Sequence, residues 1–350
     1  MITRTNHRVP RCRQAGLGLV EIMIAVTIAL FLLTGIYTLF LNTKSTYNTQ
    51  QGLSRIQENA RYAIEKLSHD VRMAGYMGCG GANPQNAVNT LNNANDYAYD
   101  FSVPIQGFDG QGTSWSPNLP PALSGLTHPP IDGTDVITVR GADGGGIRIV
   151  SPMPQPSAEL KVSTLNNSGI AIGDIVMLSD CTDAAIFQLT NVQSSDHLQH
   201  QTGTQTPGNA TKNLGKSYQA GALVQAASTR SYFIANANST SCSDGGCGLW
   251  ELTGAGSEQE LVRGVEDMQI LYGVAPGAKE TASSYVDASN VSDWSRVVSV
   301  RIALVLNSID PTSPQSYTRD FQILAQSRSI TSRRLHRVFT TTIALRNRLP

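Results

Sequence analysis

The residue of this sequence that most clearly requires a partner is an acidic residue next to a long apolar segment. Glu21 stands directly before Ile22, and from Ile22 to Thr43 the chain carries no charged residue. An acidic side chain near a membrane interior costs about 2.5–3.5 kcal/mol even on lenient insertion scales, so it normally has a partner. Gly16 precedes the apolar stretch, and cleavage after it would give Leu17 a free α-amine four residues before the carboxylate. An ion pair between this amine and Glu21, within one chain or between neighbours, is the predicted chemistry.

The element that must position this carboxylate is a membrane-spanning helix over residues 17–41. About twenty helical residues reach about 30 Å, the thickness of a bilayer core. The segment 1–16 carries four arginines and no acidic residue, which predicts a cytoplasmic N-terminus and an outward-facing remainder. A secretory signal would place its small-residue cleavage site after the apolar run, whereas Gly16 lies before it.

The helix is predicted to continue beyond the membrane. Apolar residues follow at steps of three and four, which is the spacing of one helical stripe, and they are Leu53, Ile56, Ala60, Ile64, Leu67, Val71 and Ala74. A single helix from about Leu17 to Ala74 would be about 85 Å long. Gly75 is the expected stop signal. The first half would lie in a membrane or filament core, and the second would pack under a globular head.

The arrangement Gly16-Leu-Gly-Leu-Val-Glu21 before an apolar run resembles the class III signal of type IV prepilins and type II secretion pseudopilins. The resemblance implies that a prepilin peptidase cleaves after Gly16, that Leu17 becomes the N-methylated first residue, and that Glu21 is the assembly carboxylate. Leu17 stands where the family most often has Phe, and Gly18 where it most often has Thr. The alternative is a plain membrane anchor with a chance Glu.

Residues 76–350 are predicted to form a β-rich head. Residues 76–130 are rich in Gly, Asn and Pro and predict a long loop region with short elements. Strand-like runs then recur, at Asp135–Arg140, Ile147–Val150, Gly169–Leu178, Ala185–Asn191, Ala222–Ala235, Leu249–Leu252, Leu261–Tyr272, Arg296–Asn307 and Arg337–Ala344. Polar stretches at 194–217 and 275–292 are expected to be exposed insertions. The predicted fold class is α+β, with a long N-terminal pilin-like helix packed against an antiparallel β-rich head.

Four of the five cysteines, all but Cys12, follow the apolar run, and an even number in a translocated region predicts two disulfides. Cys242 and Cys247 flank the flexible stretch Ser-Asp-Gly-Gly, so we expect them to pair, which leaves Cys79 for Cys181. Four buried free thiols are the alternative. A zinc site is disfavoured, because neither Cys79 nor Cys181 belongs to a Cys-x-x-Cys pair.

The sequence offers little other chemistry. It contains no HExxH, GxSxG or phosphate-loop motif, and we predict no catalytic residue, cofactor or metal ligand. His197 and His200 have only one nearby acidic residue, Asp196. Asp132-Gly-Thr-Asp135 lacks the remaining ligands of a calcium loop, so a turn is expected there. The formal net charge is zero overall, and without residues 1–16 it is 22 − 26 = −4, which gives no support for nucleic-acid binding.

Six arginines make the C-terminal end basic, and a solvated surface or a partner contact is expected there rather than a nucleic-acid site. They are Arg328, Arg333, Arg334, Arg337, Arg346 and Arg348.

The head also carries a resemblance. Gly75–Cys79, Gly173–Cys181, Leu261–Gly273 and the closing stretch Thr341–Arg348 are similar to PilW-family minor pilins of type IV pili. That family implies a non-enzymatic filament subunit that primes or supports pilus assembly, with downstream roles in motility or adhesion. Its partners would be the prepilin peptidase, an inner-membrane assembly platform, other minor pilins, the major pilin and a tip adhesin. Its location would be the inner membrane, with a periplasmic head, and then the surface filament.

Two alternatives to this reading remain. The strand pair around Val265–Tyr272 and Trp294–Leu306 is also similar to the J-type pseudopilin of type II secretion. A membrane-anchored hydrolase or receptor would instead require a convergent polar cleft in the head.

Overall fold

The computed structural model describes residues 18–78, 84–143, 145–166, 168–203, 205–237, 242, 245–254, 256–277 and 281–348. By their internal contacts the residues divide into two units, one up to Gln51 and one from Gly52 onward. The sequence prediction of a long N-terminal apolar helix followed by a β-rich head is confirmed.

The helix α1 spans Leu19–Met73 without interruption. Its buried residues all lie from Ile56 onward and include Ala60, Leu67 and Val71, which were predicted as members of the apolar stripe. The helix ends close to Gly75, which has φ +72°, a conformation that glycine adopts at little cost. A Cβ at this position would also meet the ring of Pro104 at 3.1 Å.

The largest sheet of the second unit has ten strands in two overlapping sets around β11 (Leu223–Asn236). The path runs β1 (Val88–Asn89), β8 (Ala184–Gln188), β7 (Ile175–Ser179), β11, β4 (Val136–Ala142), β2 (Ile105–Gln111) and β3 (Ser114–Ser116). β12 (Cys247–Thr253) and β5 (Ile147–Arg148) also pair with β11, and β13 (Ser257–Arg263) pairs with β12. The first part of β11 pairs with β7, and the rest pairs with β4 and β12.

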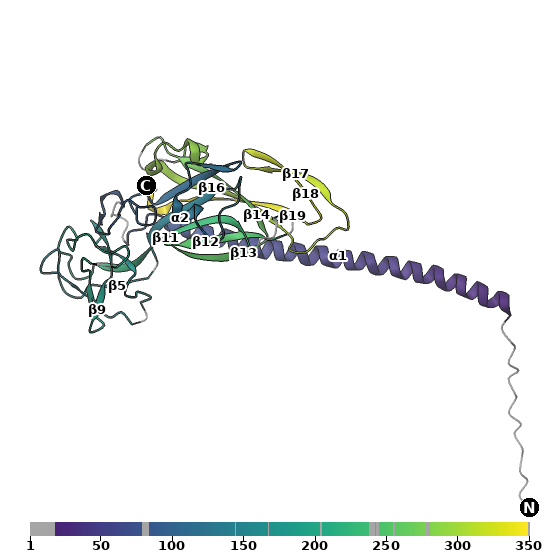
Figure 1. The fold of residues 1–350 in the computed structure, drawn as a ribbon, viewed down its shortest axis with the longest axis horizontal. Coiled ribbons are helices and arrows are strands. Elements are labelled where there is room, and N and C mark those ends of the chain that lie inside the picture. The colour runs from purple at the N-terminus through teal and green to yellow at the C-terminus, as the bar shows by residue number, and fades with distance from the viewer. Residues whose placement is uncertain are drawn as a thin grey trace, which may run out of the picture. The chain divides into compact units, whose positions relative to one another are not determined.

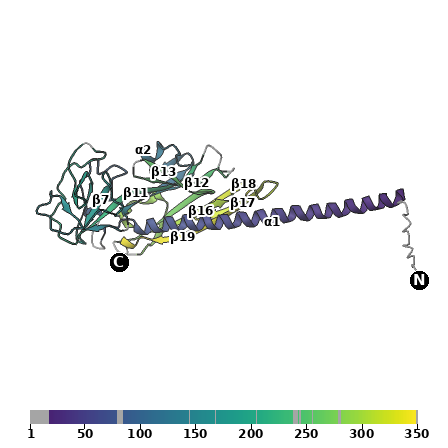
Figure 2. The ribbon, with the colours of Figure 1, turned by 90° about the horizontal axis from the view of Figure 1, so that it is seen from below.

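A four-stranded sheet packs against the second half of α1. Its order is β15 (Ser284–Val286), β14 (Val265–Val274), β16 (Val297–Asn307) and β19 (His336–Ala344). Figures 1 and 2 both show β16 and β19 beside this part of the helix. Ile56, Leu67 and Val71 of the helix share one buried cluster with Ile270 of β14 and Ile302 of β16. This cluster also receives side chains from β2, β4, β11 and β12, so it is the main core of the head.

The outer face of the four-stranded sheet is partly covered by a hairpin of β17 (Tyr317–Ile323) and β18 (Gln326–Ser332). Ile323 and Ile330 of the hairpin pack with Ala303 and Val305 of β16 and with Val338 of β19. The sequence analysis did not predict these two strands, because polar residues interrupt both of them.

Residues 147–224 form a lobe of the head with its own apolar core. It contains the sheet of β6 (Leu160–Lys161), β10 (His197–Gln199) and β9 (Asn191–Gln193), and its strands are teal in Figure 1. The prediction that residues 194–217 form an exposed insertion is wrong in part, because Leu198, His200, Asn209 and Leu214 are buried. Leu198 and Leu214 belong to the apolar core of the lobe, and polar neighbours in the sequence concealed them.

The remaining elements are short. They are the helix α2 (Pro121–Ser124) and the 3-10 turns η1 (Pro84–Asn86), η3 (Ala288–Asn290), η4 (Trp294–Arg296) and η5 (Arg346–Arg348).

Candidate assembly site

The first half of α1 exposes every large apolar side chain it carries. Between Leu19 and Leu41 the exposed fractions of these side chains run from 45% at Leu41 to 78% at Phe31. Within the described residues, α1 is the one helix long and apolar enough to cross a membrane, with a mean hydropathy of 2.5 in its most apolar window. A helix that is apolar on all sides is stable only in lipid or among other apolar surfaces, so this segment requires an environment that the head does not provide.

The threonine hydroxyl groups of this segment are satisfied by its own backbone. Each of its six threonines donates a hydrogen bond to a carbonyl of the preceding turn, at 2.7–2.9 Å, namely Thr27, Thr34, Thr38, Thr43, Thr46 and Thr49. An unpaired hydroxyl would be costly in hydrocarbon, whereas a hydroxyl bonded to the helix backbone is tolerated there. The threonines therefore do not oppose burial of the helix.

Glu21 is the one acidic residue in this exposed segment. It lies in the first turn of α1, and its backbone N–H donates to the Gly18 carbonyl at 3.0 Å. A carboxylate at this end of a helix is favoured by the exposed backbone N–H groups and the helix dipole. Among the ion pairs of residues 18–348 that the structure describes, none involves Glu21. Gly16 and Leu17 lie outside the described residues, so the cleavage position, the methylated residue and the amine partner remain predictions.

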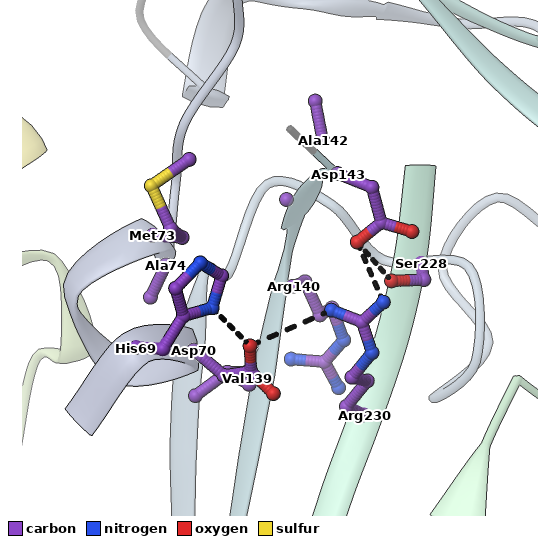
Figure 3. Close-up of a pocket in the computed structure, with 11 residues that line it drawn as sticks. His69, Asp70, Met73, Ala74, Val139, Arg140, Ala142, Asp143, Ser228 and Arg230 are labelled. Atoms are coloured by element: carbon purple, nitrogen blue, oxygen red, sulfur yellow. Dashed lines mark hydrogen bonds and ion pairs between the residues drawn. The ribbon is translucent and has the colours of Figure 1, made fainter. Parts of the chain in front are cut away.

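The second half of α1 is fixed to the head by a group of charges around the buried Asp70, and Figure 3 shows His69, Asp70, Asp143 and Arg230 of this group. Asp70 has a side chain only 3% exposed, and its carboxylate accepts from the Tyr232 hydroxyl and from His69 Nδ1, the latter at 2.8 Å. Lys66 Nζ lies 3.1 Å from Asp70 and 3.4 Å from Glu251 of β12. Every member is therefore paired, and the group joins the helix to β11 and β12.

Arg230 of β11 extends the same group. Its guanidinium lies 3.7 Å from Asp70, 3.2 Å from Glu251 and 2.6 Å from Asp143. Burial alone would raise the pKa of Asp70, but the hydrogen bonds from Tyr232 and His69 and the charges of Arg230 and Lys66 outweigh it. The pKa of Asp70 is accordingly lowered. Burial and the same carboxylate raise the pKa of Tyr232, which therefore stays a hydrogen-bond donor at ordinary pH. This group was not predicted from the sequence. The signal for it was the position of Asp70, one residue before Val71 on the buried side of the helix.

The space between these residues is small. The cavity lined by His69, Asp70, Arg140 and Arg230 has a volume of about 20 Å³, which is room for about one water molecule. No group of three or more His, Cys, Asp or Glu that could hold a metal ion occurs in the described part of the chain. The group thus connects α1 to β11 and β12 and leaves no room for a ligand larger than water.

The calcium alternative at Asp132 and Asp135 is not supported by the geometry. Asp135 is 4% exposed, and its two carboxylate oxygens accept from the backbone N–H groups of Gly110, at 2.9 Å, and Ile270, at 2.7 Å. Burial raises the pKa of Asp135 well above its ordinary value, against the effect of these two hydrogen bonds. Asp132 is exposed. Asp135 therefore connects β2 to β14, and the two carboxylates do not share one site.

The cysteines follow the predicted pattern where the structure describes them. Cys242 and Cys247 form a disulfide with a Cα–Cα distance of 4.7 Å. Cys181 is also disulfide-bonded. Cys79 lies outside the described residues, so its assignment as the partner of Cys181 remains a prediction.

The basic C-terminal region is partly used inside the head. Arg328 of β18 pairs with Asp267 of β14, whose side chain is 1% exposed. Arg334 is 9% exposed and donates to the Ser308 carbonyl at 2.9 Å. Arg337 and Arg346 are exposed. At least two of the six arginines, Arg328 and Arg334, therefore make contacts within the head.

Two family models match the chain. Residues 11–37 match the prokaryotic N-terminal methylation motif, which includes Gly16, Leu17 and Glu21. Residues 231–347 match PilW, the type IV pilus-assembly protein W. No curated protein and no solved structure matches the chain. The two matched families are structural pilin components and not enzymes. The resemblance to PilW-type minor pilins is confirmed, and the chain is a pilin-like protein related to type IV pili.

Proposed function

We propose that the protein is a minor pilin subunit of a type IV pilus, with no catalytic activity. It primes or supports filament assembly, and its downstream roles are in pilus-dependent motility or adhesion. The observation that carries this proposal is the exposed first half of α1. A helix that exposes 45–78% of each large apolar side chain between Leu19 and Leu41 needs lipid before assembly and other helices after it.

Glu21 supplies the register of assembly in this proposal. The chain is cleaved after Gly16, and the methylated amine of Leu17 on one subunit pairs with the Glu21 carboxylate of a neighbour. Such a pair neutralises a charge that would otherwise lie unpaired in an apolar setting, at a cost of about 2.5–3.5 kcal/mol. Only one axial offset between subunits forms the pair, so the pair selects that offset.

The proposed location and partners follow from this mechanism. Residues 1–16 stay in the cytoplasm until cleavage, residues 17–41 cross the inner membrane, and residues 76–350 form a head in the periplasm. The subunit then leaves the membrane for the filament through the assembly platform. Its neighbours are other minor pilins and the major pilin, and the head supports a tip adhesin.

The test is the intact mass and N-terminal sequence of the mature protein, purified from a strain with its own prepilin peptidase. A chain that begins at methylated Leu17 is expected. A Gly16→Ile variant should stay uncleaved, while a Gly18→Ala variant, with open space around its Cα, should be processed normally. An uncut wild-type chain, or one cut after the apolar run, would contradict the proposal.

The choice between a pilus and a type II secretion machine needs a second test. A mature protein found in sheared surface pili supports the pilus. A mature protein absent from pili, in a strain whose protein secretion fails when the gene is deleted, would assign it to secretion as a J-type pseudopilin.

A further inference from the structure

The outer edge of the four-stranded sheet is a long strand with an unprotected side. β19 pairs with β16 over nine consecutive residues without a register shift. Among the described residues its backbone makes no hydrogen bond to any other strand. In an antiparallel pair every second residue directs its N–H and C=O away from the neighbour, so β19 presents a row of such groups on its free side.

The edge strand β13 of the largest sheet is protected, and β19 is not. β13 carries Glu258, Glu260 and Arg263, and its pairing with β12 is broken by a register shift. β3 and β15 have only three residues each. Charges, bulges and short length are the usual protections of an edge strand against pairing with another chain. From Val338 to Ala344, β19 has the sequence Val-Phe-Thr-Thr-Thr-Ile-Ala, which has high β-propensity and no charge, proline or glycine.

Both ends of this free edge are positive. Arg337 is the second residue of the strand and Arg346 lies two residues after its end, and both are exposed. Arg301 of β16 lies beside Thr342 on the outer face, with Nε 3.4 Å from the Thr342 hydroxyl. From His336 to Arg346 the chain has no acidic residue. An incoming strand with carboxylates near its ends would therefore be favoured over one with basic ends.

We propose that the free edge of β19 binds an extended segment of a second, different protein chain, uncharged along its middle and acidic at its ends. The segment adds a strand to the four-stranded sheet through backbone hydrogen bonds. A second copy of this chain fits less well. Antiparallel self-pairing centred on Thr341 would oppose Thr340 with Thr342 but would bring Arg337 of one copy beside Arg346 of the other. This inference does not depend on the proposed filament role.

The experiment uses the full-length protein in detergent and labelled nine-residue peptides of alternating Val and Thr. One peptide has Glu at both ends and the other has Lys. Fluorescence anisotropy should give a Kd about three- to tenfold lower for the Glu-ended peptide, as expected for two exposed charge pairs. Methylation of alternate peptide nitrogens should abolish binding. Alternate amides of β19 should exchange rapidly in the free protein and become protected when the peptide binds.

Charge reversal supplies the matched variants. Arg337→Glu combined with Arg346→Glu should reverse the preference toward the Lys-ended peptide. Arg148→Glu, on the exposed strand β5 of the other lobe, should leave the preference unchanged. Equal binding of the methylated peptide, or no binding of either peptide to the folded protein, would overturn the proposal. Amides of β19 that become protected with rising protein concentration alone would show that a second copy occupies the edge, which also overturns it.

Discussion

The two halves of α1 share one backbone conformation and have opposite requirements. In the first half, up to Gln51, apolar residues occupy every face, and even the best covered large one, Leu41, is 45% exposed. In the second half, from Gly52 to Met73, apolar residues form a stripe, and Leu67 is fully buried by the head. The second half is thus covered by the head, while the first half requires lipid or other apolar surfaces around it.

The acidic residues of the two halves show the same difference. Asp70 has four partners, Lys66 and His69 of α1 and Arg230 and Tyr232 of β11. Glu21 has no ion pair among the described residues. A change at Asp70 should therefore alter the stability of the head, whereas under the proposed function a change at Glu21 should alter assembly. Substitutions in the two halves should therefore affect different measurements.

The largest expected effect is on the stability of the head. Asp70→Ala removes the carboxylate that Lys66 and Arg230 share, and it leaves the Tyr232 hydroxyl without its main acceptor. Removing one partner of a buried ion pair typically costs about 3–5 kcal/mol. The free energy of unfolding should fall by about this amount in urea titrations followed by tryptophan fluorescence, because all three tryptophans lie in the head.

The matched control is an exposed ion pair on the same helix. Arg55 lies 3.7 Å from Asp310, with the two side chains 50% and 82% exposed. Asp310→Ala should therefore cost less than about 0.5 kcal/mol. Equal losses for Asp70→Ala and Asp310→Ala would show that the buried group does not fix the helix to the head.

The next largest effect is the loss of unfolding free energy when an apolar side chain of α1 is shortened, and it should differ between the two halves. Leu67→Ala creates a cavity in the core between α1 and the four-stranded sheet, and such cavities cost about 2–5 kcal/mol. Ile28→Ala removes a side chain that is 54% exposed and is not a member of the head core. The same urea titration should show the loss for Leu67→Ala only. A comparable loss for Ile28→Ala would mean that the first half also supports the head.

A smaller effect in free energy is expected at Glu21, but in assembly rather than in folding. Glu21→Ala should leave the unfolding transition of the head unchanged and lower the amount of protein in sheared pili at least tenfold, equivalent to about 1.4 kcal/mol. Glu58→Gln, an exposed acid in the second half of α1, is the control and should incorporate normally. Normal incorporation of the Glu21 variant would contradict the role of this carboxylate.

The comparison also explains what could be predicted from the sequence. The helix and its stripe were predictable because the spacing of Ile56, Ala60 and Leu67 depends only on the geometry of an α-helix. The matched methylation motif was predictable because its residues lie close together in the sequence. Both signals are contained in a short window of sequence.

Contacts between residues that are far apart in the sequence could not be predicted in this way. Asp70, Arg230 and Glu251 meet only after β11 and β12 pack on the helix, and each alone resembles an ordinary surface charge. The hairpin β17–β18 was missed because its apolar residues are few and mostly separated by polar ones. Those that pack on the sheet are Phe321, Ile323, Leu324 and Ile330. Sequence periodicity carries no information about which distant residues meet.

The smallest effect is on the pH dependence of stability, and it distinguishes two buried acids of the head. The folded-state pKa of Asp70 lies below its ordinary value of 3.8, because its hydrogen bonds and neighbouring cations outweigh burial. The contribution of Asp70 to the free energy of unfolding is therefore present above about pH 3.8 and is lost as the pH falls through the lowered pKa.

Asp135 has no cation among its partners, and burial raises its pKa well above 3.8. The pH dependence is therefore reversed for Asp135. Its contribution to the free energy of unfolding is fully present below pH 3.8 and is lost as the pH rises through the raised pKa. Unfolding free energies measured from pH 2 to pH 7 should show a shallower loss on the acid side for Asp70→Asn. Asp135→Asn should instead reduce the loss above pH 3.8. If both variants changed the slope in the same pH range and direction, the buried charges that hold α1 would have no special role in acid stability.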